Sequence, residues 1–257
     1  MTQNERLDYL LRYLLAERKE YADIRMPDDL SEKRRLLRSL MNVRPPVPAS
    51  AEFLAVQDAY LQARLSERGV TRLGDLKPAQ PGLYLWQGDI TTLAVDAIVN
   101  AANSQMLGCF VPCHGCIDNA IHTYAGVQLR LECAEIMRKQ GCEEETGRAK
   151  ITKAYNLPCC FVLHTVGPII CGSVSKADRE LLAGCYRSCL ELAAGSDLRS
   201  VAFCCISTGE FHFPNELAAQ IAIQTVTDWQ KQNPNQMEVI FNVFKDSDRE
   251  IYERLLR

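Results

Sequence analysis

The sequence predicts a three-layer α/β fold preceded by a helical N-terminal extension. Two observations carry this prediction. From residue 81 onward, short apolar runs alternate with longer stretches of helical periodicity, which is typical of strands and helices in an α/β fold. Before that point, apolar residues recur only at helical spacing, in stretches joined by proline-rich breaks. We therefore expect an extension over residues 1–80 and an α/β domain over residues 81–257.

The extension is expected to contain three helices. Apolar residues at helical spacing predict the first helix, and they are Leu7, Leu10, Leu11, Leu14 and Leu15. A second stretch runs from about Leu30 to Leu40 and ends before Pro45. Ser50 is a candidate N-cap for a third helix that continues through Leu61, because its hydroxyl can accept a hydrogen bond from a free backbone N–H of the first turn.

In the α/β domain, apolar runs predict strands over Leu83–Trp86, Ala97–Asn100, Lys150–Ala154, Cys160–Thr165, Val201–Ile206 and Val239–Phe244. Helical periodicity predicts helices over Asp118–Gln140, Lys176–Ala194, Asn215–Gln232 and Ser247–Leu256. Ser175 is the expected N-cap of the second of these helices. Pro214 lies near the start of the third, where a missing N–H costs nothing.

Composition excludes several classes of function. The formal net charge is −3, and Lys33, Arg34 and Arg35 form the only basic cluster, so no nucleic-acid partner is expected. No window approaches the roughly 18 consecutive apolar residues of a membrane span, and the N-terminus is too charged for a secretion signal. Twelve cysteines without such a signal favour a reducing compartment, and we expect a cytoplasmic protein.

Three loop motifs follow predicted strands and could bind a nucleotide-like ligand. Asp89, in Gly-Asp-Ile-Thr, could accept hydrogen bonds from an exocyclic amine, although a turn aspartate is the commoner role. Asn100 and Asn103, separated by two alanines, could bind a ribose or belong to an Asn-rich turn. The run from Ser207 to Phe211 could hold a diphosphate on backbone N–H groups, or simply join a strand to a helix. Glu210 is then expected to point away from the phosphates.

A dense group of soft ligands lies between these motifs. Cys109, Cys113, His114 and Cys116 fall within eight residues and could hold a zinc ion, with three or four of them as ligands. A zinc deaminase also requires His-x-Glu, and none of the four histidines begins that motif, so this interpretation fails. The Cys-x-x-Cys spacing also occurs in thiol–disulfide enzymes, which we consider the weaker alternative.

Together, four motifs in order resemble the macrodomain family, the ADP-ribose-binding α/β/α module with a mixed central sheet. They are Gly88–Ile90, Asn100–Asn103, Asp118–Gly126 and Ile206–Gly209, and the resemblance covers about residues 80–257. One departure is informative. In place of the glycine run of the usual hydrolase, this chain carries Cys-x4-His-x-Cys, as the zinc-containing microbial branch of macrodomains does, and that branch also has a helical N-terminal extension.

The resemblance implies roles for individual residues. Cys109, His114 and Cys116 are expected to bind Zn²⁺, which leaves Cys113 without an assigned role. Asn103 and Asp118 are the expected catalytic residues, whereas we place His122, four residues after Asp118, outside the site. The residues expected to contact ADP-ribose are Asp89, Ile90, Asn103, Ile117, Asp118, Asn119, Ser207, Thr208, Gly209, Glu210 and Phe211.

The function implied by this resemblance is zinc-dependent removal of mono-ADP-ribose from acidic side chains of modified proteins. Family context implies a lipoyl-carrier protein as a candidate substrate and a sirtuin-like ADP-ribosyltransferase as a candidate partner. Two alternatives remain open at this stage. The chain could bind ADP-ribose without catalysis, or it could deacetylate O-acetyl-ADP-ribose, which presents a similar ester.

Overall fold

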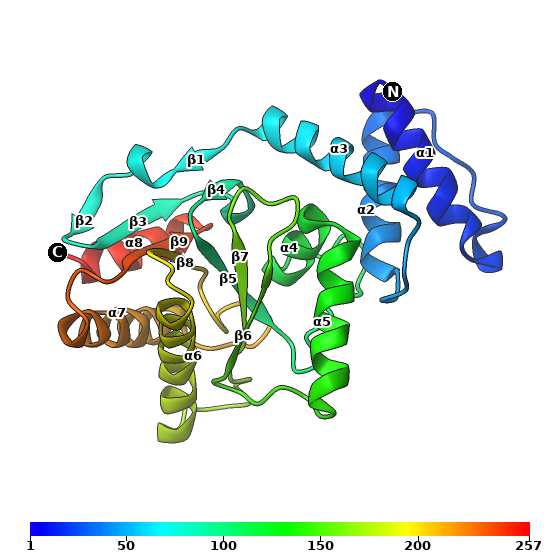
Figure 1. Cartoon of the computed structure of the whole chain (residues 1–257). Coiled ribbons are helices and arrows are strands. Elements are labelled where there is room, and N and C mark those ends of the chain that lie inside the picture. Colours follow the sequence, from blue (N-terminus) through cyan, green and yellow to red (C-terminus); the bar gives the residue numbers. More distant parts are fainter.

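The computed structural model describes residues 1–257 and contains a seven-stranded mixed sheet flanked by helices (Figure 1). The strand order is β2-β3-β9-β8-β5-β7-β6. The five inner strands are parallel, and β2 and β6 pair antiparallel at the two edges. The strands are β2 (Pro78–Gln80), β3 (Leu83–Gln87), β5 (Ala97–Ala102), β6 (Ala149–Lys153), β7 (Phe161–Val166), β8 (Ser200–Phe203) and β9 (Glu238–Val243).

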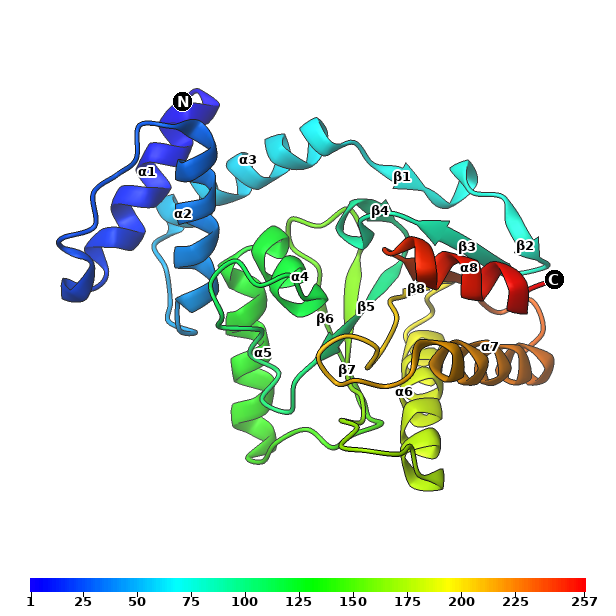
Figure 2. The ribbon, with the colours of Figure 1, turned by 180° about the vertical axis from the view of Figure 1, so that it is seen from behind.

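Five helices cover the sheet, and their residues join it in one core cluster of 42 buried residues. α4 and α5 pack near β5 and β6, and α6, α7 and α8 pack side by side (Figure 2). Ser175 caps α6 as predicted, and the structure adds a capping box with Asp178. The helices are α4 (Ile117–Ala125), α5 (Val127–Gln140), α6 (Lys176–Gly195), α7 (Asn215–Gln232) and α8 (Asp246–Leu255). The predicted α/β/α fold is confirmed.

The extension forms three helices with a core of their own. They are α1 (Gln3–Ala16), α2 (Leu30–Val43) and α3 (Ala51–Arg68), and Ser50 caps α3 as predicted. Their leucines and aromatic residues make a separate cluster of 11 buried residues, which Val127 of α5 joins from the α/β domain. The extension therefore packs against the domain at α4 and α5. None of the helices is long and apolar enough to cross a membrane.

The structure differs from the expected extension at its end. Residues 71–80, which the sequence placed in the extension, already pair with the α/β domain: β1 (Thr71–Arg72) is parallel to β4 (Leu93–Ala94), and β2 pairs with β3. Such short, exposed strands give no clear alternation of apolar and polar residues, which explains why the sequence pattern did not reveal them.

The single helix predicted over Asp118–Gln140 is wrong. Gly126 interrupts it with φ of +97°, so that α4 ends and α5 begins at this residue. The reason lies in the extension: Gln57 of α3 accepts a hydrogen bond from the N–H of Val127 at 3.0 Å. A Cβ at Gly126 would lie only 2.6 Å from Nε2 of Gln57, so the close approach of α3 requires glycine.

Candidate active site

The predicted motifs meet at one edge of the sheet. β3, β5 and β8 belong to the parallel part of the sheet, and the loops that follow them carry Asp89, Asn103 and Ser207 respectively. In open α/β sheets, ligands bind beyond the carboxyl ends of such strands. The N-terminus of α4 reaches the same region and brings Asp118 with it.

Asp89 is held by a residue from the extension. Its Oδ1 accepts hydrogen bonds from the N–H and hydroxyl of Thr91 at 3.0 and 2.6 Å, while Oδ2 pairs with Nη1 of Arg68 at 2.9 Å. The Arg68 guanidinium also lies 3.7 Å above the Tyr124 ring of α4. A carboxylate has about four acceptor positions, so one remains for an amine of a ligand. The side chain of Ile90, next to it, is buried in the core.

The loop after β8 presents free backbone donors. Ser207 has a left-handed φ of +64°, and its buried hydroxyl has no hydrogen-bond partner. The N–H groups of Gly209, Glu210 and Phe211 make no hydrogen bond within the chain, whereas the Thr208 hydroxyl donates to the Cys205 carbonyl at 3.0 Å. Consecutive free N–H groups around a left-handed residue form a concave site that suits an anion.

Cys109, His114 and Cys116 converge. Their ligand atoms all lie within 4.8 Å of one another, and Cys109 Sγ is 3.6 Å from His114 Nδ1. Zinc bound tetrahedrally, at its usual distances to sulfur and nitrogen, places two such atoms about 3.6 Å apart. The three side chains are half-buried, which leaves room for a fourth ligand from solvent or substrate. The donor set therefore fits a three-ligand zinc site.

Cys113 does not join this group. Its Sγ faces the carbonyl oxygen of Arg35 at 3.4 Å, so the four-ligand alternative is not realised in this conformation. Cys116 caps α4 by accepting the N–H of Asn119 at 3.4 Å. Burial raises the pKa of Cys116 to about 12, and this hydrogen bond opposes the shift. On its other side, His114 Nε2 lies 3.6 Å from the carboxylate of Glu210.

Asp118 is a buried carboxyl at the start of α4. It accepts a hydrogen bond from Asn100 Nδ2 at 2.8 Å and lies 3.5 Å from His122 Nε2. Burial raises the pKa of Asp118 to about 6, while the hydrogen bond from Asn100 and the charge of Arg130 oppose the shift. A carboxyl group with a pKa near neutrality can exchange a proton with water under physiological conditions.

A second group of potential metal ligands lies behind Asp118; hydrogen bonds occupy both ring nitrogens of its His164, whereas those of its His122 have no hydrogen-bond partner. Besides His122, it comprises Cys133 and His164, and all three are buried. Asn100 Nδ2 lies 3.1 Å from His164 Nδ1, which places the proton of the neutral ring on Nε2, where it donates to Thr152 Oγ1 at 2.9 Å. His164 thus has no free nitrogen for a metal, and the group orients Asn100.

The remaining predicted residues belong to the walls of the site. Asn103 closes the turn before the cysteine loop: its Nδ2 donates to the Gly108 carbonyl at 3.2 Å, and its Oδ1 accepts from Met106 N–H at 3.1 Å. Asn119 is fully buried, and its amide donates to the Val111 carbonyl at 2.9 Å, so its side chain supports the loop. Ile117, half-buried, packs on the core.

Comparison with known proteins agrees with this architecture. A model of the Macro domain matches residues 99–222. A protein-ADP-ribose hydrolase of Treponema medium is 57% identical, with all of both chains covered. This chain belongs to the macrodomain family. A protein-ADP-ribose hydrolase of Staphylococcus aureus is 52% identical over 96% of this chain and 94% of the relative.

Solved macrodomain structures share the fold. A Trypanosoma brucei macrodomain in complex with ADP-ribose superimposes with a TM-score of 0.67 at 32% identity, over 86% of this chain and 95% of that one. Sequence reasoning missed the contribution of Arg68, since nothing in the sequence at the end of α3 indicates a partner 21 residues away.

Proposed function

We propose that this macrodomain is a zinc-dependent hydrolase that removes mono-ADP-ribose from acidic side chains of modified proteins. One observation carries the proposal. The thiols of Cys109 and Cys116 and the imidazole of His114 converge, and the buried carboxyl of Asp118 follows Cys116 by two residues. The relatives named protein-ADP-ribose hydrolase, which match this chain over almost its full length, support the activity.

The ligand would extend across the whole edge of the sheet. Asp89 would accept the exocyclic amine of adenine, and the free N–H groups of Gly209 to Phe211 would bind the diphosphate. The distal ribose would then lie between Asn103 and the cysteine loop. Glu210 supports this placement, because its carboxylate turns towards His114 and so leaves the backbone donors free for phosphate oxygens.

In the proposed reaction, water attacks C1″ of the distal ribose, the ester bond from C1″ to the Asp or Glu side chain breaks, and the carboxylate leaves. Asp118 accepts the proton of the attacking water, and Asn100 keeps the Asp118 carboxylate in place. Zinc held by Cys109, His114 and Cys116 would supply a Lewis acid that orients a ribose hydroxyl or lowers the pKa of a bound water. A lipoyl-carrier protein as substrate and a sirtuin-like transferase as partner belong to this proposal.

The test is release of ADP-ribose from a protein modified on acidic residues, measured together with the zinc content of the purified enzyme. We expect stoichiometric zinc and hydrolysis, a loss of about 100-fold or more in Asp118→Asn, and loss of both zinc and activity in Cys116→Ser. Cys113→Ser is the matched control, since its thiol faces away from the other three ligands, and it should keep both.

Three results would contradict the proposal. Hydrolysis that survives both chelation and Cys116→Ser would remove zinc from the mechanism. Tight binding of ADP-ribose without release under any condition would instead indicate a non-catalytic binding protein. Preferential cleavage of O-acetyl-ADP-ribose over modified protein would point to the deacetylase alternative.

A further inference from the structure

Two residues of the extension hold the backbone around His114. Arg38 and Asn42 lie one turn apart on α2 and so project from the same face of the helix. Nη2 of Arg38 donates to the carbonyl oxygen of His114 at 2.9 Å, and Oδ1 of Asn42 accepts the N–H of Cys113 at 2.9 Å. The backbone of Cys113 and of His114, a candidate metal ligand, is thus held from one side by α2.

The same two side chains also connect α2 to α4. Arg38 donates to Oδ1 of Asn119 through Nη2 and Nε, at 2.8 and 3.2 Å, and Asn42 donates to Oγ1 of Thr123 at 2.9 Å. Asn119 and Thr123 are again one turn apart. Because Asn119 also donates to a loop carbonyl, at Val111, the two helices and the loop form one continuous hydrogen-bonded network.

This network is buried and sustains an unfavourable backbone conformation. Asn42 is 1% exposed and Asn119 is 0% exposed, so breaking either set of hydrogen bonds would leave a polar group without water to replace its partner. Cys113 has a left-handed φ of +53°, which is disfavoured for a residue with a Cβ. The hydrogen bond from its N–H to Asn42 stabilises the conformation that turns His114 towards Cys109.

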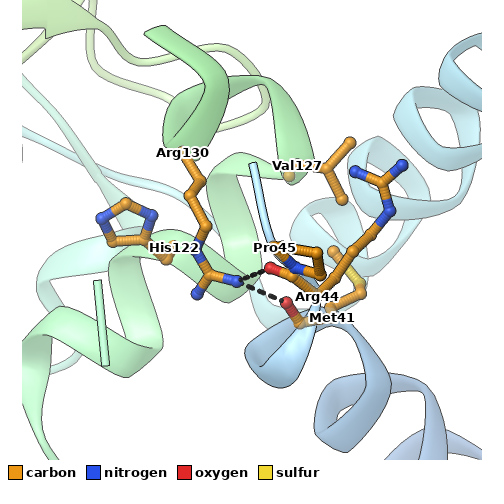
Figure 3. Close-up of a pocket in the computed structure, with 7 residues that line it drawn as sticks. Met41, Arg44, Pro45, His122, Val127 and Arg130 are labelled. Atoms are coloured by element: carbon orange, nitrogen blue, oxygen red, sulfur yellow. Dashed lines mark hydrogen bonds between the residues drawn. The ribbon is translucent and has the colours of Figure 1, made fainter. Parts of the chain in front are cut away.

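A third side chain fixes the end of α2. Figure 3 shows Arg130 of α5 donating through Nη1 to the carbonyl oxygens of Met41 and Arg44, next to His122. A guanidinium is well placed at a helix C-terminus, where free carbonyls gather. Nε of Arg130 donates to the Leu107 carbonyl at 2.7 Å, just before the cysteine loop. Both the start and the middle of the loop are therefore tied to α2.

We propose that Arg38 and Asn42 are positioning residues of the candidate metal centre and that α2 belongs to that centre as its outer support. The inference rests on the proposed zinc site but assigns a role to the extension that the hydrolase proposal does not require. With these contacts in place, His114 faces Cys109 and Cys116 before any metal arrives. Without them, the loop has to be ordered at the expense of metal affinity.

The experiment compares Arg38→Met and Asn42→Leu with Gln62→Leu in the full chain. Gln62 of α3 also ties the extension to the domain, by donating to the Asn156 carbonyl at 3.1 Å, but has no contact with the loop, so it is the matched control. Two quantities are measured: hydrogen exchange of the amides at 109–116 in chelator-treated protein, and the rate of zinc release from loaded protein to a chromogenic chelator.

We expect both rates to rise at least about tenfold in Arg38→Met and Asn42→Leu, because the loss of a single buried hydrogen bond is worth about that much and each variant loses more than one, and to be unchanged in Gln62→Leu. Arg38→Lys keeps a cationic donor on a single nitrogen, so it should give intermediate rates. It replaces Arg38→Met in the comparison if Arg38→Met fails to fold. Exchange and release equal to those of Gln62→Leu would overturn the proposal. Hydrogen exchange is measured without metal, so the two proposals can fail separately. Wild-type protein purified without zinc would contradict the hydrolase proposal. Faster exchange of the loop amides in Arg38→Met and Asn42→Leu would still support the positioning role.

Discussion

Arg68, the last residue of α3, pairs with Asp89 at 2.9 Å and stacks on Tyr124 at 3.7 Å. The ion pair fixes the rotamer of a carboxylate that we expect to bind adenine. Arg68→Met should therefore weaken ADP-ribose binding by about two- to fivefold, because a partly exposed ion pair contributes up to about 1 kcal/mol. Calorimetric titration with ADP-ribose measures this.

The control for that titration lies one turn earlier on the same helix. Arg64 pairs with Glu67 and has no contact with Asp89, so Arg64→Met removes an equal charge and should leave the affinity unchanged. Equal weakening in both variants would mean that the effect is one of overall charge and that Arg68 does not orient the carboxylate.

The two buried histidines behind Asp118 should make folding sensitive to acid. Burial lowers the pKa of His164 from 6.5 to about 3 and lowers that of His122 well below its usual value. Below pH 6.5 these two side chains take up protons in the unfolded chain but not in the folded chain. Their contribution to the free energy of unfolding is therefore full above about pH 6.5 and is lost as the pH falls. Each proton contributes a slope of about 1.4 kcal/mol per pH unit.

Replacing one of these histidines isolates its share of the slope. His164→Gln should lower the number of protons taken up on unfolding between about pH 4.5 and 6 by about one. This number is obtained from the slope of the unfolding free energy against pH, measured by urea unfolding at several pH values. His212→Asn, which removes an exposed imidazole at a left-handed position that asparagine tolerates, is the control. Identical slopes in the wild type and His164→Gln would show that His164 titrates equally in both states.

Gly126 should be intolerant of a side chain for two separable reasons. Its φ is +97°, and a Cβ would meet the Gln57 amide at 2.6 Å. We expect Gly126→Ala to cost about 2–4 kcal/mol, of which about 1–3 kcal/mol is the backbone, because φ of +97° with ψ of 175° is a conformation open almost only to glycine. Gly69→Ala, at a similar backbone conformation with φ of 81° and ψ of 163° and with no atom within 4 Å of the new Cβ, carries only the backbone part. Equal losses in urea unfolding would exclude the contact with Gln57 as a cause.

The sequence was informative where local physics decides the structure. The apolar runs that became β5 and β7 stand out because both strands are buried, and Ser50 and Ser175 capped the helices expected of them. Gly126 was misjudged, since the break it makes depends on a residue about seventy positions away. Helical periodicity continues through such a glycine and cannot report a neighbour in another segment.

The candidate site likewise divides into residues that the sequence indicated and residues that it did not. The resemblance selected Cys109, His114 and Cys116 from among four ligands, and the structure brings those three together while Cys113 turns towards α2. Neither the motif nor its spacing could indicate what orients them. In the sequence, Arg38 and Asn42 look like ordinary residues of an amphipathic helix. Their partners in the loop are more than 70 residues away, so no local pattern indicates these contacts.

The extension meets the candidate site at two points: α3 reaches Asp89, and α2 reaches the cysteine loop. A shortened protein that began at Pro81 would keep every residue of the recognised motifs and still lose the partner of Asp89 and the support of His114. Grafting those motifs onto a bare macrodomain should therefore transfer the chemistry poorly unless the three helices go with them.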